Sequence, residues 1–396
     1  MTADQAKSSA NQGANQGADQ GAEATLVATL DAIRPADQAA LTAARDRQDR
    51  LTKPRGALGV LEEVSIRLAG LAGTCPPPDP SPAAVAVFAA DHGVHAQGVS
   101  PWPQEVTAQM VANFLAGGAA VNVLARQAGA AVVVVDAGVA TSLDGLVPDG
   151  ALAPDASAIQ PEQPRLIERA VRRGSDDISI RPAMTRDQAV QGLVNGIEIA
   201  GQLAAAGYRC LVAGDMGIAN TTASAALIAA FTGADPADVT GRGTGIDDDA
   251  HRHKVGVVRS ALARRTAEND THPQGPIDIL ASVGGLEHAQ IAGFILGAAA
   301  HRVPLVLDGV IAGASALVAA ALAPAVVDAC LAGHRSAEPG HAVALQQLGL
   351  TPLVDLELRL GEGSGAVLAL PLVRSAVAVL REMATFDAAG VTEKSS

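Results

Sequence analysis

Short apolar runs alternate with segments of helix length between residues 83 and 333 of this chain. Five runs are expected to form buried strands, at residues 85–90, 131–135, 210–213, 277–281 and 304–307. Continuous apolar strands separated by helices are typical of a parallel sheet with helices on both faces. Most of the runs end in a polar or glycine-rich turn, and such sheets bind ligands beyond the carboxyl ends of their strands. The pattern therefore predicts an α/β fold with its site at these turns.

The two ends of the chain follow other patterns. Residues 1–24 repeat short units of Ala, Asn or Asp, Gln and Gly that cannot bury apolar surface, so we predict a disordered tail there. Helical periodicity runs over residues 25–48 and 58–71, and it returns after about His334. The segment 141–175 is rich in Pro, Asp and Gly and is expected to be irregular.

Composition narrows the class of protein. Hydrophobic residues make up 48% of the chain and aromatic residues only 2%, so the core must consist largely of Ala, Val, Leu and Ile. A net charge of −13 argues against a nucleic-acid surface. The three cysteines, Cys75, Cys210 and Cys330, form no CxxC pair, which is typical of a reduced, cytoplasmic protein.

Two features bear on a membrane or export location. The N-terminus lacks a basic region followed by an apolar one, so no signal peptide is predicted. Residues 309–327 are uncharged, but Gly313 and Pro324 interrupt them, which favours a buried helix over a membrane span. We therefore expect no membrane partner.

Glycine-rich turns supply candidate anion sites. The segment 214–222, GDMGIANTT, follows a predicted strand and opens an Ala-rich helix, whose free N–H groups would bind a phosphate or carboxylate. Simple helix capping is the alternative. A second loop at 240–245 lies near Lys254, which would neutralise a phosphate, and a third turn spans 282–287. The spaced glycines of a Walker A loop with GK[ST] are missing, which argues against an ATPase.

One carboxylate stands out near the C-terminus. Glu362 lies between glycines in the LGEGSG segment 360–365, where a ligand can approach closely and the acid can serve as a general base. A solvated turn is the alternative. An acid also follows the predicted strand 131–135, at Asp136, but no second acid or TGGT-like loop accompanies it. That argues against magnesium-assisted departure of pyrophosphate.

Histidines raise the possibility of a metal site in two places. The first set is Asp91, His92 and His95, and the second is His334 with the residues at 338 and 341. Neither set matches HExxH or another strong signature, so turn and capping roles are expected instead. No metal and no cofactor is predicted.

Several motifs occur in a fixed order along the chain: KPRGALGVLE at 53–62, DHGV at 91–94, PAMT at 182–185, the 214–222 loop, VGG at 283–285, LDG at 307–309, SAE at 336–338 and RLGEGSG at 359–365. Together they resemble the nicotinate-nucleotide–dimethylbenzimidazole phosphoribosyltransferases of cobalamin lower-ligand assembly. The resemblance covers nearly the whole chain after the tail.

The resemblance implies a fold and an organisation. The family has a large domain with a parallel sheet and helices on both faces, plus a smaller helical domain built from both chain ends. Carried over to this chain, residues 25–78 begin the small domain, 79–333 form the large domain, and 334–396 carry the catalytic loop and complete the small domain. The resemblance also implies a homodimer.

The resemblance implies a reaction as well. A ring nitrogen of 5,6-dimethylbenzimidazole attacks the anomeric carbon of nicotinate mononucleotide, nicotinate leaves, and α-ribazole 5′-phosphate forms with inverted configuration. The departing ring nitrogen becomes neutral and needs no general acid, and no pyrophosphate leaves. By resemblance, Glu362 is the base that accepts the benzimidazole proton.

The other implied site residues fall into three groups. Asp215 stands where the family has Glu, one methylene longer, so whether Asp215 assists Glu362 directly or only electrostatically stays open. The nucleotide and its phosphate are assigned to Gly217, Ala219, Asn220, Thr221, Gly241, Gly243, Lys254, Gly284 and Gly285. The benzimidazole is assigned to Trp102, Met110 and Leu360, although the only tryptophan could equally anchor a surface loop.

Two other functions compete with this interpretation. A non-catalytic paralogue would keep the glycine loops and bind a nucleotide or a benzimidazole without turnover, an idea that Asp215 favours and the intact Glu362 opposes. A dinucleotide-dependent oxidoreductase would need a GxGxxG turn in the first strand–helix unit, which the chain lacks.

Overall fold

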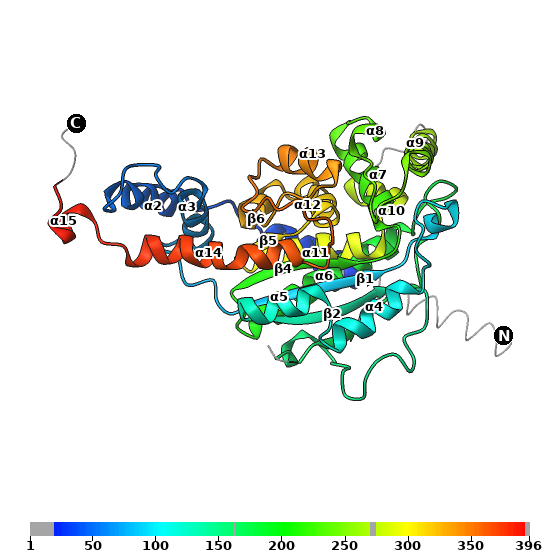
Figure 1. The fold of residues 1–396 in the computed structure, drawn as a ribbon, viewed down its shortest axis with the longest axis horizontal. Helices are drawn as coiled ribbons and strands as arrows, with labels where there is room; N and C mark the ends of the chain where they lie inside the picture. The colour runs from blue at the N-terminus through cyan, green and yellow to red at the C-terminus, as the bar shows by residue number, and fades with distance from the viewer. Residues whose placement is uncertain (1–19, 161–162, 270–274, 393–396) are drawn as a thin grey trace.

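Six parallel strands form the centre of the molecule in a computed structural model of the chain (Figure 1). The structure describes residues 20–160, 163–269 and 275–392. Strand bounds are β1 Ala83–Ala90, β2 Ala130–Gly138, β3 Arg165–Glu168, β4 Cys210–Met216, β5 Leu305–Leu307 and β6 Cys330–Ala332. Their order is β3-β2-β1-β4-β5-β6, so the chain changes direction across the sheet between β1 and β4. Ligands of open parallel sheets bind at the carboxyl ends beside such a switch point.

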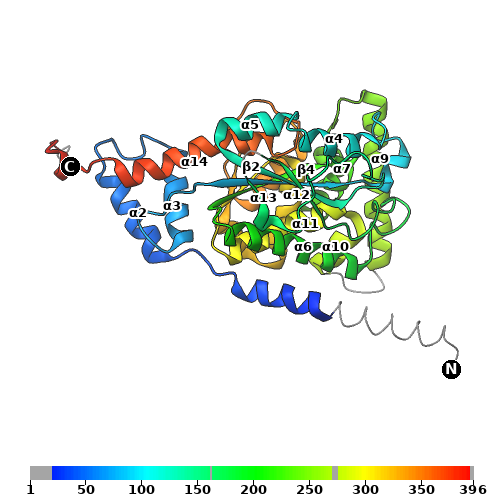
Figure 2. The same ribbon diagram turned by 90° about the horizontal axis from the view of Figure 1, so that it is seen from below.

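Helices cover both faces of this sheet (Figure 2). The α4, α5 and α14 helices contact the strands on one face, and α6 and α11 pack together on the other. The predicted parallel sheet with helices on both faces is confirmed.

Helix bounds are α2 Gln38–Arg50, α3 Val60–Ala72, α4 Val106–Leu115, α5 Ala120–Ala128, α6 Arg186–Ala205, α7 Asn220–Thr232, α8 Pro236–Val239, α9 Asp248–Asn269, α10 Pro276–Val283, α11 Leu286–Ala300, α12 Val310–Leu322, α13 Pro339–Leu348, α14 Ser364–Glu382 and α15 Phe386–Ala389, with 3₁₀ turns η1 Gly93–Gln97, η2 Ala156–Ala158 and η3 Pro324–Ala329.

The strand predicted at residues 277–281 is wrong, because this segment belongs to α10. Pro276 occupies the first turn, where its missing N–H costs nothing, and the Asp278 carboxylate accepts the Gly275 N–H at 2.9 Å. An apolar run of five residues fits a buried helix as well as a buried strand, and here the helix-start residues decide. The turn at Gly284 consequently joins two helices rather than a strand and a helix.

Two short strands, β3 and β6, were not predicted from the sequence. The edge strand β3 lies inside the segment 141–175, which was expected to be irregular, and β6 has only three residues. Strands this short carry too few positions to show a period. Their pairing partners, β2 and β5, supply the order that the local sequence lacks.

The chain ends combine helices from distant parts of the sequence. The α2 and α3 helices pack against each other and against α14, at one end of the molecule (Figure 1). This packing fits the smaller helical domain that was predicted, whose boundaries stay a prediction. The 25–48 periodicity is interrupted around Pro35, between a helix over residues 20–32 and α2.

The predicted tail over residues 1–24 lies mostly outside the described residues. Its last part, residues 20–24, is helical, and this helix continues to residue 32. Ala22 and Leu26 are buried, with 8% and 2% of their surface exposed, so the helix packs against the core.

Glycines bring α6 and α11 into close contact. A Cβ atom added at Gly196 would lie 1.9 Å from the Gln290 carbonyl oxygen, and one added at Gly293 would lie 1.8 Å from that of Leu193. Such distances leave no room for a methyl group between the two backbones. These small residues let two helices pack closely beneath the sheet in a core with few aromatic rings.

Within the described part of the chain, two segments are long and apolar enough to cross a membrane by composition alone, residues 106–128 and α14. The first is divided into α4 and α5. The second packs against strands β4 and β5, and 56% of its apolar window is buried. The segment 309–327 forms α12 and η3, and α12 is largely buried inside the protein, as predicted. Buried core helices pass the same test of composition.

Candidate active site

A cavity of about 370 Å³ lies at the carboxyl ends of the central strands. The β4 strand ends here, and the loops before α7 and α14 meet above it. Eleven of the predicted site residues line this cavity: Trp102, Met110, Asp215, Gly217, Ala219, Asn220, Thr221, Gly243, Lys254, Leu360 and Glu362. Residues that are far apart in the sequence thus line a single cavity, as predicted from the turns at the strand ends.

Glu362 is held in an unusual backbone conformation at the base of the cavity. Its φ angle is +64°, a left-handed value that a non-glycine residue rarely adopts. Its side chain is buried, and the Oε2 atom accepts the N–H of Val121 at 3.2 Å, at the start of α5. A Cβ atom at Gly214 would lie 2.4 Å from the Glu362 carbonyl oxygen, so β4 needs a glycine there.

Burial raises the pKa of the Glu362 carboxyl group, and the nearby charge of Asp308 raises it further. The hydrogen bond from Val121 opposes both effects. A carboxylate with a raised pKa is a stronger base than an exposed one, which suits proton abstraction. The general-base role of Glu362 that the resemblance implies stays a prediction, and the raised pKa is compatible with it.

Asp215 lies beside Glu362 at the end of β4. Its main-chain oxygen accepts the Glu362 N–H at 3.2 Å, and its Oδ2 atom accepts the Asn220 side-chain amide at 3.0 Å. Burial raises the pKa of Asp215 well above its usual value, and the charges of Asp308, Glu287 and Glu362 add to this. Asp215 and Glu362 are therefore coupled through the main chain and through their charges.

The 214–222 loop, which was predicted to bind an anion, leads into the start of α7 at the cavity. Ala219 has a φ of +74° and turns the chain into the helix, while Thr221 and Asn220 face the cavity. Lys254 reaches in from α9 and donates to the Thr221 Oγ1 atom at 2.8 Å. Burial lowers the pKa of Lys254 to about 8, opposed by the charge of Glu338. A helix N-terminus and a buried ammonium together favour a phosphate.

Three predicted nucleotide residues do not line the cavity. Gly241 packs against the Glu338 carboxylate, and Gly285 packs against the ring of His92. Gly284 packs against Leu280 in the preceding helix. These glycines therefore let neighbouring groups approach closely behind the site.

Some cavity residues received no role from the sequence. Glu338 accepts the Gly243 N–H at 2.8 Å, and Arg359 donates to the Gly243 carbonyl oxygen at 2.9 Å. Arg242, His334 and Ser336 also line the cavity. The motifs around 336–338 and 359–365 contained most of them, but spacing alone could not show that both motifs reach the 240–245 loop.

The members of the first histidine set considered for a metal bind different partners in the fold. The Asp91 carboxylate accepts from the Thr107 hydroxyl at 2.6 Å, and His95 bonds the Trp102 carbonyl oxygen at 2.8 Å. His92 instead lies 2.7 Å from Glu287, which also contacts the ring of His288 at 2.9 Å.

The atoms of His92, Glu287 and His288 lie within 4.8 Å of one another, the arrangement nearest to a metal site among the described residues. Their nitrogen–oxygen distances are those of hydrogen bonds rather than of ligands spread around an ion. Burial lowers the pKa of His92, but Glu287 outweighs it, so that pKa is raised. The cluster is therefore best described as a buried charge network that supports the turn after β1.

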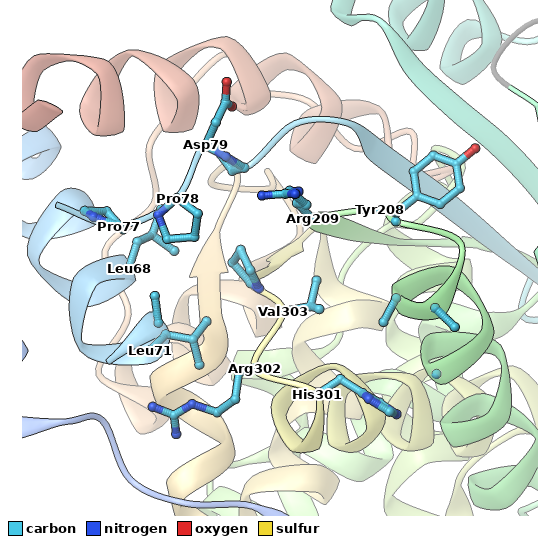
Figure 3. Close-up of a pocket in the computed structure, with 17 residues that line it drawn as sticks. Leu68, Leu71, Pro77, Pro78, Asp79, Tyr208, Arg209, His301, Arg302 and Val303 are labelled. Carbon is cyan, nitrogen blue, oxygen red and sulfur yellow. The ribbon is translucent and has the colours of Figure 1, made fainter. Parts of the chain in front are cut away.

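A second cavity, of about 460 Å³, lies at the other end of the strands, between α3 and the α/β region (Figure 3). Leu68, Leu71 and Arg302 are among the residues around it. Arg302 donates to the carbonyl oxygens of Gly70 and Pro35 and so joins the two parts of the protein. None of the predicted site residues lines this second cavity.

A family model described as phosphoribosyltransferase matches residues 33–391 of the chain. The chain belongs to this family. This chain is 61% identical over 366 residues to a protein of Salinispora tropica named nicotinate-nucleotide--dimethylbenzimidazole phosphoribosyltransferase. The match covers 92% of this chain and 98% of that protein. A protein of the same name from Chloroflexus aggregans is 53% identical over 91% of this chain and 96% of its own length. The resemblance inferred from the motifs is confirmed.

Solved structures agree with the sequence relatives. A crystal structure of nicotinate-nucleotide-dimethylbenzimidazole phosphoribosyltransferase from Thermus thermophilus is 47% identical and has a TM-score of 0.80, covering 90% of this chain and all of that one. A second structure from the same organism, named CobT, is 48% identical with a TM-score of 0.81, covering 90% of this chain and 99% of that one. At this identity, both the fold and the family are established.

Proposed function

We propose that this phosphoribosyltransferase transfers the phosphoribosyl group of nicotinate mononucleotide to 5,6-dimethylbenzimidazole, giving α-ribazole 5′-phosphate and nicotinate. The observation that carries the proposal is the shared cavity, in which Glu362 faces the anion site formed by α7 and Lys254. The names of the relatives support the same substrates. This activity would place the protein in the assembly of the cobalamin lower ligand.

The chemistry needs little beyond what these residues supply. As the benzimidazole nitrogen bonds to the anomeric carbon, the bond from that carbon to nicotinate breaks, and its electron pair returns to the pyridinium nitrogen. The benzimidazole N–H proton passes to the Glu362 carboxylate. Asp215 lines the same cavity and, when ionised, would stabilise the developing positive charge on the ribose. Holding both substrates in line contributes the rest of the acceleration.

The cavity divides into two proposed subsites. The phosphate of nicotinate mononucleotide would bind at the start of α7, with Lys254 and Gly243. The flat benzimidazole would lie against Trp102, Met110 and Leu360, which line the wall beside Glu362. Trp102 and Leu360 are 50% and 57% exposed, so they offer apolar surface that a planar ring can cover.

The direct test is an incubation of the purified protein with nicotinate mononucleotide and 5,6-dimethylbenzimidazole, followed by liquid chromatography and mass spectrometry. We expect nicotinate and α-ribazole phosphate in equal amounts. If neither forms while nicotinate mononucleotide still binds, the non-catalytic paralogue becomes the better description, with the shorter Asp215 as its cause.

Lys254 gives a prediction about the phosphate subsite. Lys254→Met removes the ammonium but keeps the chain length, and we expect KM for nicotinate mononucleotide to rise roughly 10–100-fold, because a charged hydrogen bond is lost. The kcat value should change much less. Steady-state kinetics checks this, with Arg259→Met on the exposed side of the same helix as control. An unchanged KM would place the phosphate elsewhere.

The same residue predicts a pH dependence. Because burial lowers the pKa of Lys254 to about 8, the ammonium is lost as pH rises through that value. We expect KM for nicotinate mononucleotide to increase above about pH 8, whereas an exposed lysine would keep its charge to about pH 10. A KM that stays constant from pH 7 to 9.5 would contradict this.

We also propose that the protein is a cytoplasmic homodimer, as the resemblance implies. Support comes from Leu356, an apolar side chain that is 58% exposed and that a second copy would cover. Light scattering should then give about twice the chain mass of 39.6 kDa. A mass of one chain at micromolar concentration would refute the dimer.

A further inference from the structure

Asp308 lies directly beneath the loop that carries Glu362. It follows β5 and is fully buried. Its Oδ2 atom accepts the N–H of Gly363 at 3.2 Å, and its Oδ1 atom accepts that of Ala366 at 2.9 Å. Gly363 is the N-cap residue of α14, and Ala366 lies in the first turn of this helix, which starts two residues after Glu362. A carboxylate from another part of the chain therefore caps this helix.

The loop needs such an external cap. The φ angles of Gly361, Glu362 and Gly363 are +82°, +64° and +90°, so three consecutive residues adopt left-handed backbone conformations. Gly363 is the N-terminal cap residue of α14 and has no side chain with which to bond the helix. A left-handed non-glycine residue is strained and persists only where its surroundings fix it. Asp308 supplies two of the bonds that fix it.

Asp308 also contributes a negative charge to the site in its ionised form. Burial raises the pKa of Asp308, while His334 and the N–H groups of Ala366 and Gly363 oppose this effect. The His334 Nε2 atom lies 3.5 Å from its Oδ1 atom, and His334 itself lines the cavity. On its far side, His334 faces the ring of His341 at 5.8 Å between centroids. Burial raises the pKa of Glu362, the Asp308 charge adds to this, and the Val121 N–H opposes it. The ionisable groups that share the cavity with Glu362 are Asp215, Arg242, Lys254, His334, Glu338 and Arg359.

We propose that Asp308 is a positioning residue for the reaction, which holds Glu362 in its left-handed conformation through the Gly363 and Ala366 amides and keeps a negative charge beneath it. The inference rests on the proposed role of Glu362 as the base. Asp308 acts through the loop and touches neither substrate. Its carboxylate thereby links β5 to the reacting atoms.

Asp308→Glu tests the geometry. The longer side chain keeps the charge but pushes against the α14 amides, and we expect kcat to fall by roughly 10²-fold, since a displacement of about 1 Å has an effect of that order. KM for nicotinate mononucleotide should stay near the wild-type value, because the phosphate subsite lies on α7. A wild-type kcat in this variant would overturn the positioning role.

Asp308→Asn tests the charge. Removing the negative charge lowers the pKa of Glu362, so the acidic limb of the kcat–pH profile should shift to lower pH. A merely structural role would lower kcat at every pH without moving that limb. Both proteins use the same substrates, so substrate ionisation cancels in the comparison. An unshifted limb in a folded Asp308→Asn protein would overturn the inference.

Asp136→Asn is the matched control. Asp136 is also buried at the end of a strand and accepts two backbone N–H groups, those of Gly138 at 3.0 Å and Val139 at 2.8 Å. Its charged neighbour is Arg173, and it does not line the catalytic cavity. The acidic limb of its kcat–pH profile should lie at the same pH as in the wild type. A shift equal to that of Asp308→Asn would overturn the assignment of Asp308 as the positioning residue.

A second readout separates this inference from the proposed activity. The Glu362 carboxyl can be titrated by ¹³C NMR in labelled protein, with its signal assigned by its absence in Glu362→Gln. If the wild type releases no nicotinate, the proposed activity fails, but Asp308→Asn should still lower the Glu362 pKa. An equal pKa in the two proteins would overturn the inference whatever the activity.

Discussion

Glu362→Gln is expected to reduce kcat by about 10²–10⁴-fold, the usual contribution of a positioned general base. Glutamine keeps the shape of the side chain and can still accept the Val121 N–H through its amide oxygen, but it cannot take up the benzimidazole proton. Binding of nicotinate mononucleotide and the melting temperature should stay near the wild-type values. Nicotinate release measures kcat, and calorimetry measures both nucleotide binding and the melting temperature.

Glu382→Gln makes the same chemical change at the far end of α14, where the side chain is exposed. It should leave kcat unchanged. Wild-type turnover in Glu362→Gln would remove Glu362 from the mechanism and leave orientation of the substrates as the source of catalysis. A loss of nucleotide binding in the same variant would instead show that Glu362 shapes the cavity.

Among the substitutions proposed for this protein, Gly293→Ala is expected to produce the largest loss of folding stability. The added Cβ atom would lie 1.8 Å from the Leu193 carbonyl oxygen and 2.6 Å from its carbonyl carbon, so α6 and α11 must move apart. Overpacking of a rigid core costs roughly 1–3 kcal/mol, and more where backbone must shift. Thermal unfolding followed by circular dichroism should show a clearly lower melting temperature.

Gly256→Ala is the control for this change. Gly256 is exposed in the middle of α9, and no described atom beyond the helix itself lies within 4 Å of its added Cβ position. Alanine in an exposed helix is favoured over glycine by about 0.5–1 kcal/mol, so this variant should melt slightly above the wild type. If Gly293→Ala and Gly256→Ala have the same melting temperature, the result contradicts the close contact between α6 and α11.

The same two glycines show how far sequence reasoning reaches in the core. Both lie in helical segments where glycine is intrinsically unfavourable. Nothing in the sequence says that only Gly293 contacts a neighbouring backbone, because that contact joins α6 to α11 across about a hundred residues. The cost of each substitution is set by packing, which the local pattern does not contain.

The site divides in a similar way. The residues of the 214–222 loop and Glu362 were identifiable, because glycine turns and strand-end acids have short-range signatures. The roles of Asp308, Glu338 and Arg359 were not, since each acts on a segment far away in the chain. Gly285 was predicted at the nucleotide, but its neighbour is the ring of His92.

The sequence by itself determined the parallel sheet, the helices on its faces and the end of the sheet where the site lies, because apolar periodicity and turn residues act over a few positions. It failed at residues 277–281, where a short apolar run fits two structures and helix-start contacts decide between them. Only the tertiary structure decided which carboxylates meet, how burial and neighbouring charges shift their pKa values, and that Asp308 caps α14. These properties depend on distances between residues remote in the chain, and no local pattern encodes such distances.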